Sequence, residues 1–140
     1  MIIQHLNWLA VAVAAIAYFM LGAIWFNPNV FGKVWMKGHN ISTPTEEDKK
    51  KMPMMMLMTL VMCFVATVCL AYLINAFSGY TVNWRWYSGV KIALVASAFA
   101  CVGVGLNHMY TKKSMMTTII DAGYHVAGLV AAGMILSVWH

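Results

Sequence analysis

Long runs of apolar residues alternate along this chain with shorter polar connections. Four runs are each long enough to form a helix of about 20 residues, which crosses a hydrocarbon core of roughly 30 Å. They cover approximately Leu6 to Phe26, Met54 to Phe77, Tyr87 to Tyr110 and Thr117 to Trp139. Helices are favoured because lipid offers the backbone amides no hydrogen-bond partners. The pattern predicts an all-α integral membrane protein with a single transmembrane domain over residues 1–140.

The connections between these runs predict the topology. The second and third connections are short, so they join antiparallel neighbours and favour an up-down four-helix bundle. The first connection, residues 27–53, is longer. In it Phe31, Val34 and Trp35 oppose Lys33 and Lys37 at helical spacing. This spacing predicts a short helix that lies in the membrane interface, with its lysines toward lipid phosphates.

The second half of the first connection contains signals for a polar helix. Thr43-Pro44-Thr45-Glu46 has the form of a capping box with proline at the first helical position. Pro53 should break or kink that helix before the second span, because a proline inside a helix loses a hydrogen bond and clashes with the preceding turn. We therefore expect a short polar helix that is broken or kinked before the second span begins.

Composition excludes several classes of protein. Hydrophobic residues make up 62% of the chain and charged residues only 9%. A soluble globular domain, a disordered tail and a nucleic-acid-binding module are all excluded, because none of them could leave so much apolar surface in water. The three cysteines lie inside apolar runs without C-x-x-C spacing, so no disulfide framework or zinc site is indicated.

The basic residues predict the orientation. Seven flank the first and third connections, namely Lys33, Lys37, Lys49, Lys50, Lys51, Lys112 and Lys113, and two lie by the second, Arg85 and Lys91. The positive-inside rule places the first and third connections in the cytoplasm and both termini on the periplasmic or extracellular face. Tryptophan and lysine near span ends should anchor the protein in the interface. The expected anchors are Trp25, Trp35, Lys33, Lys37, Trp84 and Trp86.

Polar residues inside apolar spans are the candidate functional residues, since the bilayer admits them only at a cost. Asp121 is the only acid outside the first connection, and His125 follows it by four residues, so both project from one helix face. Asn107, His108 and Asn27 end their spans at the same predicted depth. These five residues are a candidate polar or ion site near the cytoplasmic face. The alternatives are a helix N-terminal stabiliser at Asp121 and an interhelical hydrogen-bond network.

Two further kinds of chemistry are disfavoured. Thirteen methionines invite a Cu(I) site, but of those that crowd the start of the second span only Met55, Met58 and Met62 share a face. We expect no metal site and no cofactor. The chain has no nucleophile or phosphate-binding motif, so we expect no enzyme.

The two ends of the chain resemble a known family. Asn7-Trp8-Leu9-Ala10-Val11, Gly22-Ala23-Ile24-Trp25-Phe26-Asn27-Pro28 and Phe31-Gly32-Lys33-Val34-Trp35-Met36 are similar to the opening of the bacterial membrane family called domain of unknown function 1761. Asp121-Ala122-Gly123-Tyr124-His125 and Gly133-Met134-Ile135-Leu136 resemble its closing motif, in which Asn commonly stands where this chain has Asp121. The resemblance implies a small four-helix protein of the bacterial inner membrane. It implies no activity.

These observations lead to two functional hypotheses. The first is a structural or accessory membrane component, surrounded by lipid, that forms a homo-oligomer or joins a larger complex and binds no nucleic acid. Its contact would use the small residues Gly123, Ala127 and Ala131, with Gly128 and Ala132 beside them. The alternative is a small transporter or channel in which Asp121 and His125 bind a proton, a cation or a polar solute.

Overall fold

The structure, a computed structural model, describes residues 6–42, 44–78 and 86–139. Every regular element in these ranges is helical. The elements are α1 (Trp8–Trp25), a π-helical segment η2 (Pro28–Gly32), α2 (Lys33–Gly38), α3 (Glu46–Ser78), α4 (Trp86–Tyr110) and α5 (Met115–Val138). Helices α1, α3, α4 and α5 are long and apolar enough to cross a membrane. The predicted all-α class and the four long apolar helices are therefore confirmed.

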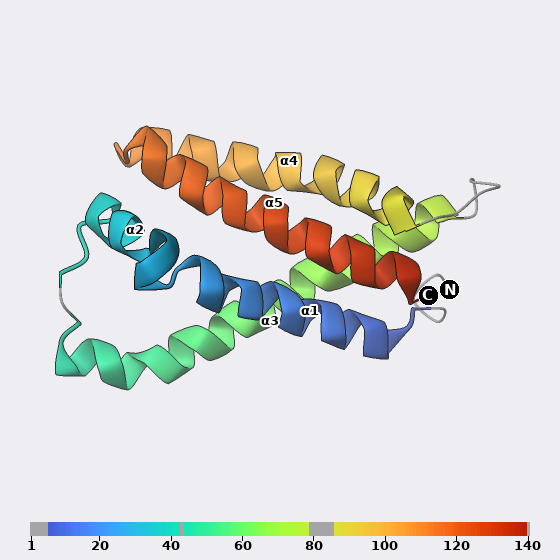
Figure 1. Cartoon of the computed structure of the whole chain (residues 1–140), viewed down its shortest axis with the longest axis horizontal. Coiled ribbons are helices and arrows are strands. Elements are labelled where there is room, and N and C mark those ends of the chain that lie inside the picture. Colours follow the sequence, from blue (N-terminus) through green and yellow to red (C-terminus); the bar gives the residue numbers. More distant parts are fainter. Residues whose placement is uncertain (1–5, 43, 79–85, 140) are drawn as a thin grey trace.

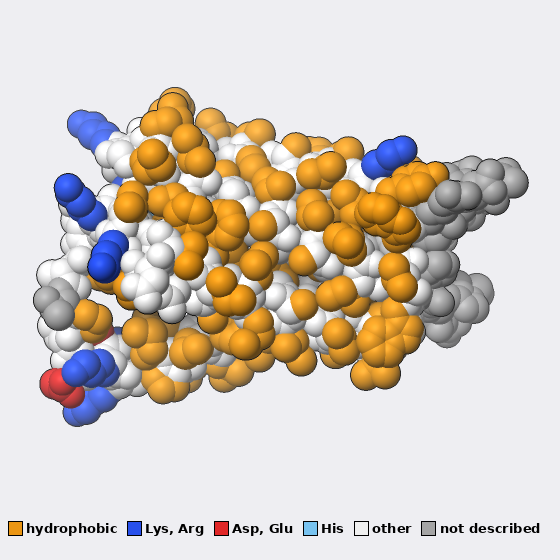
Figure 2. Space-filling model, in the orientation of Figure 1, with side chains coloured by type: hydrophobic (Ala, Val, Ile, Leu, Met, Phe, Trp, Pro, Cys, Tyr) orange, Lys and Arg blue, Asp and Glu red, His pale blue; other side chains and the backbone are white. Residues whose placement is uncertain are grey.

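The four long helices run alternately in opposite directions (Figure 1). The start of α1 and the end of α5 lie at one end of the molecule, where the Asn7 side-chain amide donates to the Trp139 carbonyl at 3.3 Å. Helix α2, the start of α3, the end of α4 and the start of α5 lie at the other end. Most of the described lysines gather at this second end, which we call the lysine-rich end (Figure 2).

Helix α5 is the centre of the packing, since it contacts each of the other α-helices. Its buried side chains include Tyr124, Leu129 and Leu136. Helices α4 and α5 approach each other closely at Gly89. A Cβ on Gly89 of α4 would overlap Ser137 Oγ of α5, so glycine is required for the two helices to lie this close.

Helix α3 differs from the prediction at its start. The helix runs without interruption through Pro53, so the expected break is wrong. Pro53 has no N–H, so the helical hydrogen bond to the Lys49 carbonyl is missing. Because residues 46–59 are all exposed, this carbonyl can bind water or a headgroup instead. The capping box lies two residues later than predicted. Thr45 Oγ1 accepts from the Asp48 amide at 3.2 Å, and Asp48 Oδ2 accepts from the Thr45 amide at 2.9 Å.

Candidate functional site

Asp121 lies in the second turn of α5 at the lysine-rich end, and its side chain is only 14% exposed. Trp35 Nε1–H donates to Asp121 Oδ1 at 2.7 Å. The other carboxylate oxygen, Oδ2, lies 3.0 Å from His39 Nε2 and 3.2 Å from His108 Nε2. The carboxylate thus joins side chains from α2, the residue after α2, and α4. No lysine of the described residues forms an ion pair with it.

Two of these side chains come from the first connection, which folds back onto α5. Asn27 caps η2, because its side-chain oxygen accepts from the Asn29 amide at 2.9 Å. Trp35 and His39 are four residues apart in the sequence, so their side chains project from the same side of this segment. The centroids of their rings lie 4.7 Å apart. Gly38 allows the end of α2 to lie close to the start of α5, because a Cβ at this position would overlap Thr117 Oγ1.

His108 comes from the last turn of α4 and is buried. Its second ring nitrogen, Nδ1, lies 3.0 Å from Thr118 Oγ1 on α5. The connection after α4 is tight, with Lys112 in the left-handed region at φ 54°. The rings of His108 and His39 lie edge to face at 5.6 Å. Two imidazoles and one carboxylate thereby converge from three segments of the chain.

The structure brings together only two of the five predicted site residues, Asp121 and His108. Asn107 is exposed, because neighbours on a helix point about 100° apart and His108 takes the position that faces α5. Asn27 serves as the helix cap described above. His125 faces α1 instead, where its Nδ1 lies 2.7 Å from the Tyr18 hydroxyl.

Tyr18 and His125 belong to a second polar group in the middle of the bundle. Tyr124 OH lies 3.6 Å from Cys63 Sγ and donates to the Tyr18 carbonyl at 3.5 Å. A Cβ on Gly128 would overlap the Tyr18 ring, so this small residue of the predicted ladder is used within the chain. The group links α1, α3 and α5 through hydrogen bonds between buried or half-buried side chains.

The residues expected to be interfacial anchors fall into two sets. Lys33, Lys37 and Trp86 are exposed at the two ends of the helices. Trp25 and Trp35 instead turn toward α5: Trp25 Nε1–H donates to the Ile120 carbonyl at 3.0 Å and Trp35 to Asp121. Trp84 lies outside the described residues.

Sequence reasoning missed His39 and the bond from Trp35 to Asp121. His39 stands in a polar connection next to Gly38, a position that gives no signal of burial. The available hint was the pair Trp35 and His39 at helical spacing, which places an indole and an imidazole on one side of the segment predicted to be a helix. Nothing in the pattern showed that this side would meet α5 rather than lipid.

His39, His108 and Asp121 together offer three atoms of the kinds that bind metal ions. One ligand atom each of His39, His108 and Asp121 lies within 4.8 Å of the other two. The methionines at the start of α3 are arranged differently, because Met54, Met55, Met56, Met58 and Met62 are all exposed around the helix. Of these two candidate ligand sets, only the His39, His108 and Asp121 set converges.

Comparison with known proteins identifies a family. A family model described as "Protein of unknown function (DUF1761)" matches residues 9–137. No curated protein matches the chain. No solved structure matches it.

Proposed function

The chain belongs to the DUF1761 family of proteins of unknown function, and from this premise we propose that it is an accessory component of the bacterial inner membrane. In this proposal it spans the membrane four times, has no catalytic activity, and works bound to a protein partner, either a second copy of itself or another membrane protein. Its lysine-rich end faces the cytoplasm, and the start of α1 and the end of α5 face the periplasm.

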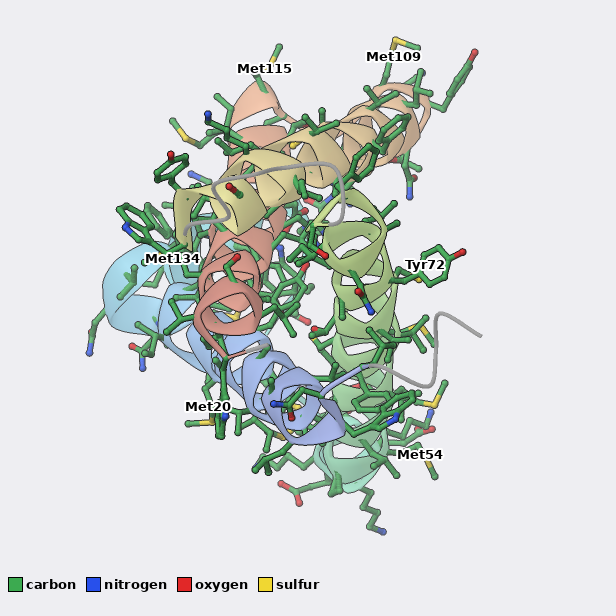
Figure 3. All side chains as sticks on the ribbon, turned by 90° about the vertical axis from the view of Figure 1, so that its right-hand side faces the viewer. Met20, Met54, Tyr72, Met109, Met115 and Met134 are labelled. Carbon is green, nitrogen blue, oxygen red and sulfur yellow. The ribbon has the colours of Figure 1, made fainter. Side chains whose placement is uncertain are left out.

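The outer surface supports the embedding in lipid. Apolar side chains point outward from all four long helices, as Met20, Tyr72, Met109, Met115 and Met134 do in Figure 3. Fully apolar surroundings are the condition in which such a surface is stable, whereas water would favour its burial. Lysines gathered at one end complete the pattern of a protein held with that end on the cytoplasmic side (Figure 2).

The observation that carries the accessory role is the first half of α3. Every residue from Glu46 to Met62 is exposed except Leu60, which is half-buried. The buried residues of this helix, Cys63, Thr67, Leu70, Ala71 and Ile74, all lie in its second half. A membrane helix that packs on its own chain over only half its length offers the other half to a neighbour. Six of the seventeen residues from Glu46 to Met62 are methionines, whose flexible side chains adapt readily to different partner surfaces.

The transport alternative is less well supported. It required Asp121 and His125 to act together in binding a proton, a cation or a solute. Asp121 faces Trp35, His39 and His108, whereas His125 faces Tyr18. Since the two residues have separate partners, their joint role loses its geometric basis.

Crosslinking in native membranes tests the accessory role. In a background with Cys63, Cys69 and Cys101 replaced by Ala, Val61→Cys places a thiol on the exposed half of α3, and Val95→Cys places a matched one on exposed α4. We expect a bifunctional thiol-to-amine reagent to trap a defined homo-oligomer or a stoichiometric partner through Val61→Cys but not through Val95→Cys. Native mass spectrometry after mild detergent extraction should recover the same assembly. A stable lone monomer, with no crosslink from either position, would contradict the proposal.

A further inference from the structure

We propose that His39 Nε2, His108 Nε2 and Asp121 Oδ2 together bind one divalent transition-metal ion at the lysine-rich end. The three ligand atoms come from the residue after α2, the last turn of α4 and the second turn of α5. The proposal concerns this cluster alone, and it does not depend on which partner covers α3.

The spacing of the ligand atoms fits a single ion. Ligands held at about 2.0–2.2 Å from a tetrahedral metal lie about 3.3 Å from one another. Asp121 Oδ2 lies 3.0 Å from His39 Nε2 and 3.2 Å from His108 Nε2. The third pair, the ligand atoms of His39 and His108, lies within 4.8 Å, so these two imidazoles are the groups that would move closer together around an ion.

The side chains behind the cluster orient the ligands as they do in metal sites. Metal-binding histidines usually donate their other ring N–H to an oxygen, and metal-binding carboxylates are themselves hydrogen-bonded. Trp35 Nε1–H donates to Oδ1 of Asp121 at 2.7 Å, which leaves Oδ2 to face the two imidazoles. His108 Nδ1 lies 3.0 Å from Thr118 Oγ1.

The Thr118 hydroxyl lies between two possible partners, the Ser114 carbonyl and His108 Nδ1. In the arrangement in which this hydroxyl donates its single hydrogen to the Ser114 carbonyl at 3.2 Å, its oxygen accepts from His108 Nδ1–H at 3.0 Å. In the neutral imidazole, Nε2 then presents a lone pair to the Asp121 carboxylate. Two electron pairs that face each other at this distance repel, unless a proton or a metal ion lies between them.

The ligand set indicates the class of metal. Two imidazole nitrogens and one carboxylate oxygen suit Zn²⁺, Fe²⁺, Co²⁺ or Ni²⁺, whereas Ca²⁺ and Mg²⁺ prefer oxygen ligands and Cu(I) prefers sulfur. Three protein ligands leave a further coordination position for water or another ligand. An ion bound here would also tie the first connection, through His39, to α4 and α5.

Zinc binding to the full-length protein in detergent, purified with a tag that contains no histidine, tests the proposal. We expect metal-stripped protein to take up one zinc per chain, measured by calorimetry and elemental analysis. His39→Gln, His108→Gln and Asp121→Asn should each weaken binding by more than about a hundredfold. Trp35→Phe, which keeps a ring but removes the N–H donor, should weaken binding about ten- to hundredfold without changing the stoichiometry.

His125→Gln is the matched control, because this histidine lies on the same helix as Asp121 but faces Tyr18. It should keep its zinc affinity, and so should a chain with His5 and His140 both replaced by Gln. Circular dichroism of each variant checks that the helices are retained. Cobalt gives a second readout, since its visible absorption reports nitrogen and oxygen ligands in a four- or five-coordinate shell.

Two results would overturn the metal site. One is wild-type protein that binds neither zinc nor cobalt while its helices are intact. The other is zinc bound equally well by wild type, His39→Gln and Asp121→Asn, which would place the ion elsewhere. Either result would leave the crosslinking of α3 unaffected, so the two proposals fail separately.

Discussion

Tyr18 and His125 form a side-chain contact of 2.7 Å between α1 and α5. Tyr18 is 3% exposed, so its hydroxyl has no access to bulk solvent and depends on this partner. Asp121, one turn before His125 on α5, bonds to a different set of side chains at the lysine-rich end. Asp121 and His125 therefore share one face of α5 but bind different partners.

The hydrogen bond of Tyr18 contributes to stability. We expect Tyr18→Phe to lower the free energy of unfolding by about 0.5–2 kcal/mol, because His125 loses its partner while the ring packing against Tyr124 and Gly128 stays. Denaturant unfolding in detergent, followed by circular dichroism, measures this change. Tyr72→Phe is the control, since Tyr72 points outward from α3 (Figure 3) and should change nothing. Equal effects of the two variants would refute the role of the bond.

Helices α4 and α5 are held together by small residues at one level of the bundle. Gly89 and Ala93 of α4 lie against Gly133 and Ser137 of α5. Ser137 Oγ donates back to the Gly133 carbonyl of its own helix at 2.6 Å. Close backbone approach of this kind drives helix association in lipid, where hydrophobic burial gives no advantage.

A methyl group at this contact should separate the two helices. Gly89→Ala is expected to destabilise the protein by about 1–3 kcal/mol, because the new Cβ overlaps Ser137 Oγ and must displace one helix. Gly103→Ala, on the same helix, has no atom within 4 Å of the added Cβ. It should be neutral or stabilise by up to about 1 kcal/mol through helix propensity. Thermal unfolding of both variants in the same detergent measures the two changes in stability. Equal stability of Gly89→Ala and Gly103→Ala would show that close packing at Gly89 does not stabilise the protein.

The whole molecule combines an apolar middle with a cluster of lysines at one end (Figure 2). The Asp121 cluster lies at that end, with α2 folded over the start of α5 (Figure 1). If the lysine-rich end faces the cytoplasm, the ions that reach the cluster come from the cytoplasm. The orientation of the protein in the membrane therefore determines from which compartment ions reach the Asp121 cluster.

Thiol labelling tests this orientation. In the background without native cysteines, Lys112→Cys marks the lysine-rich end and Trp86→Cys marks the opposite end, at the start of α4. With an impermeant maleimide, we expect Trp86→Cys to react in intact cells and Lys112→Cys to react only after the membrane is permeabilised. The reverse result would show that the lysine-rich end, and with it the Asp121 cluster, faces the outside of the cell.

The four apolar helices, their order and the family were all readable from residue patterns. Lipid imposes a length and an apolar composition on any helix that crosses it, so each candidate span is visible without knowledge of its neighbours. The terminal motifs around Trp25 and Asp121 were distinctive enough to predict the DUF1761 family, which the match over residues 9–137 confirms.

The partners of Asp121 depended on contacts between distant segments. His39 reaches the carboxylate because Gly38 allows α2 to lie against Thr117, and His108 does so because its position, rather than that of Asn107, faces α5. The continuity of α3 through Pro53 likewise depends on its exposed surroundings. Spacing along a chain defines which side chains share a helix face. It does not define which neighbour that face meets, because helix faces of similar apolarity pair according to shape and close approach.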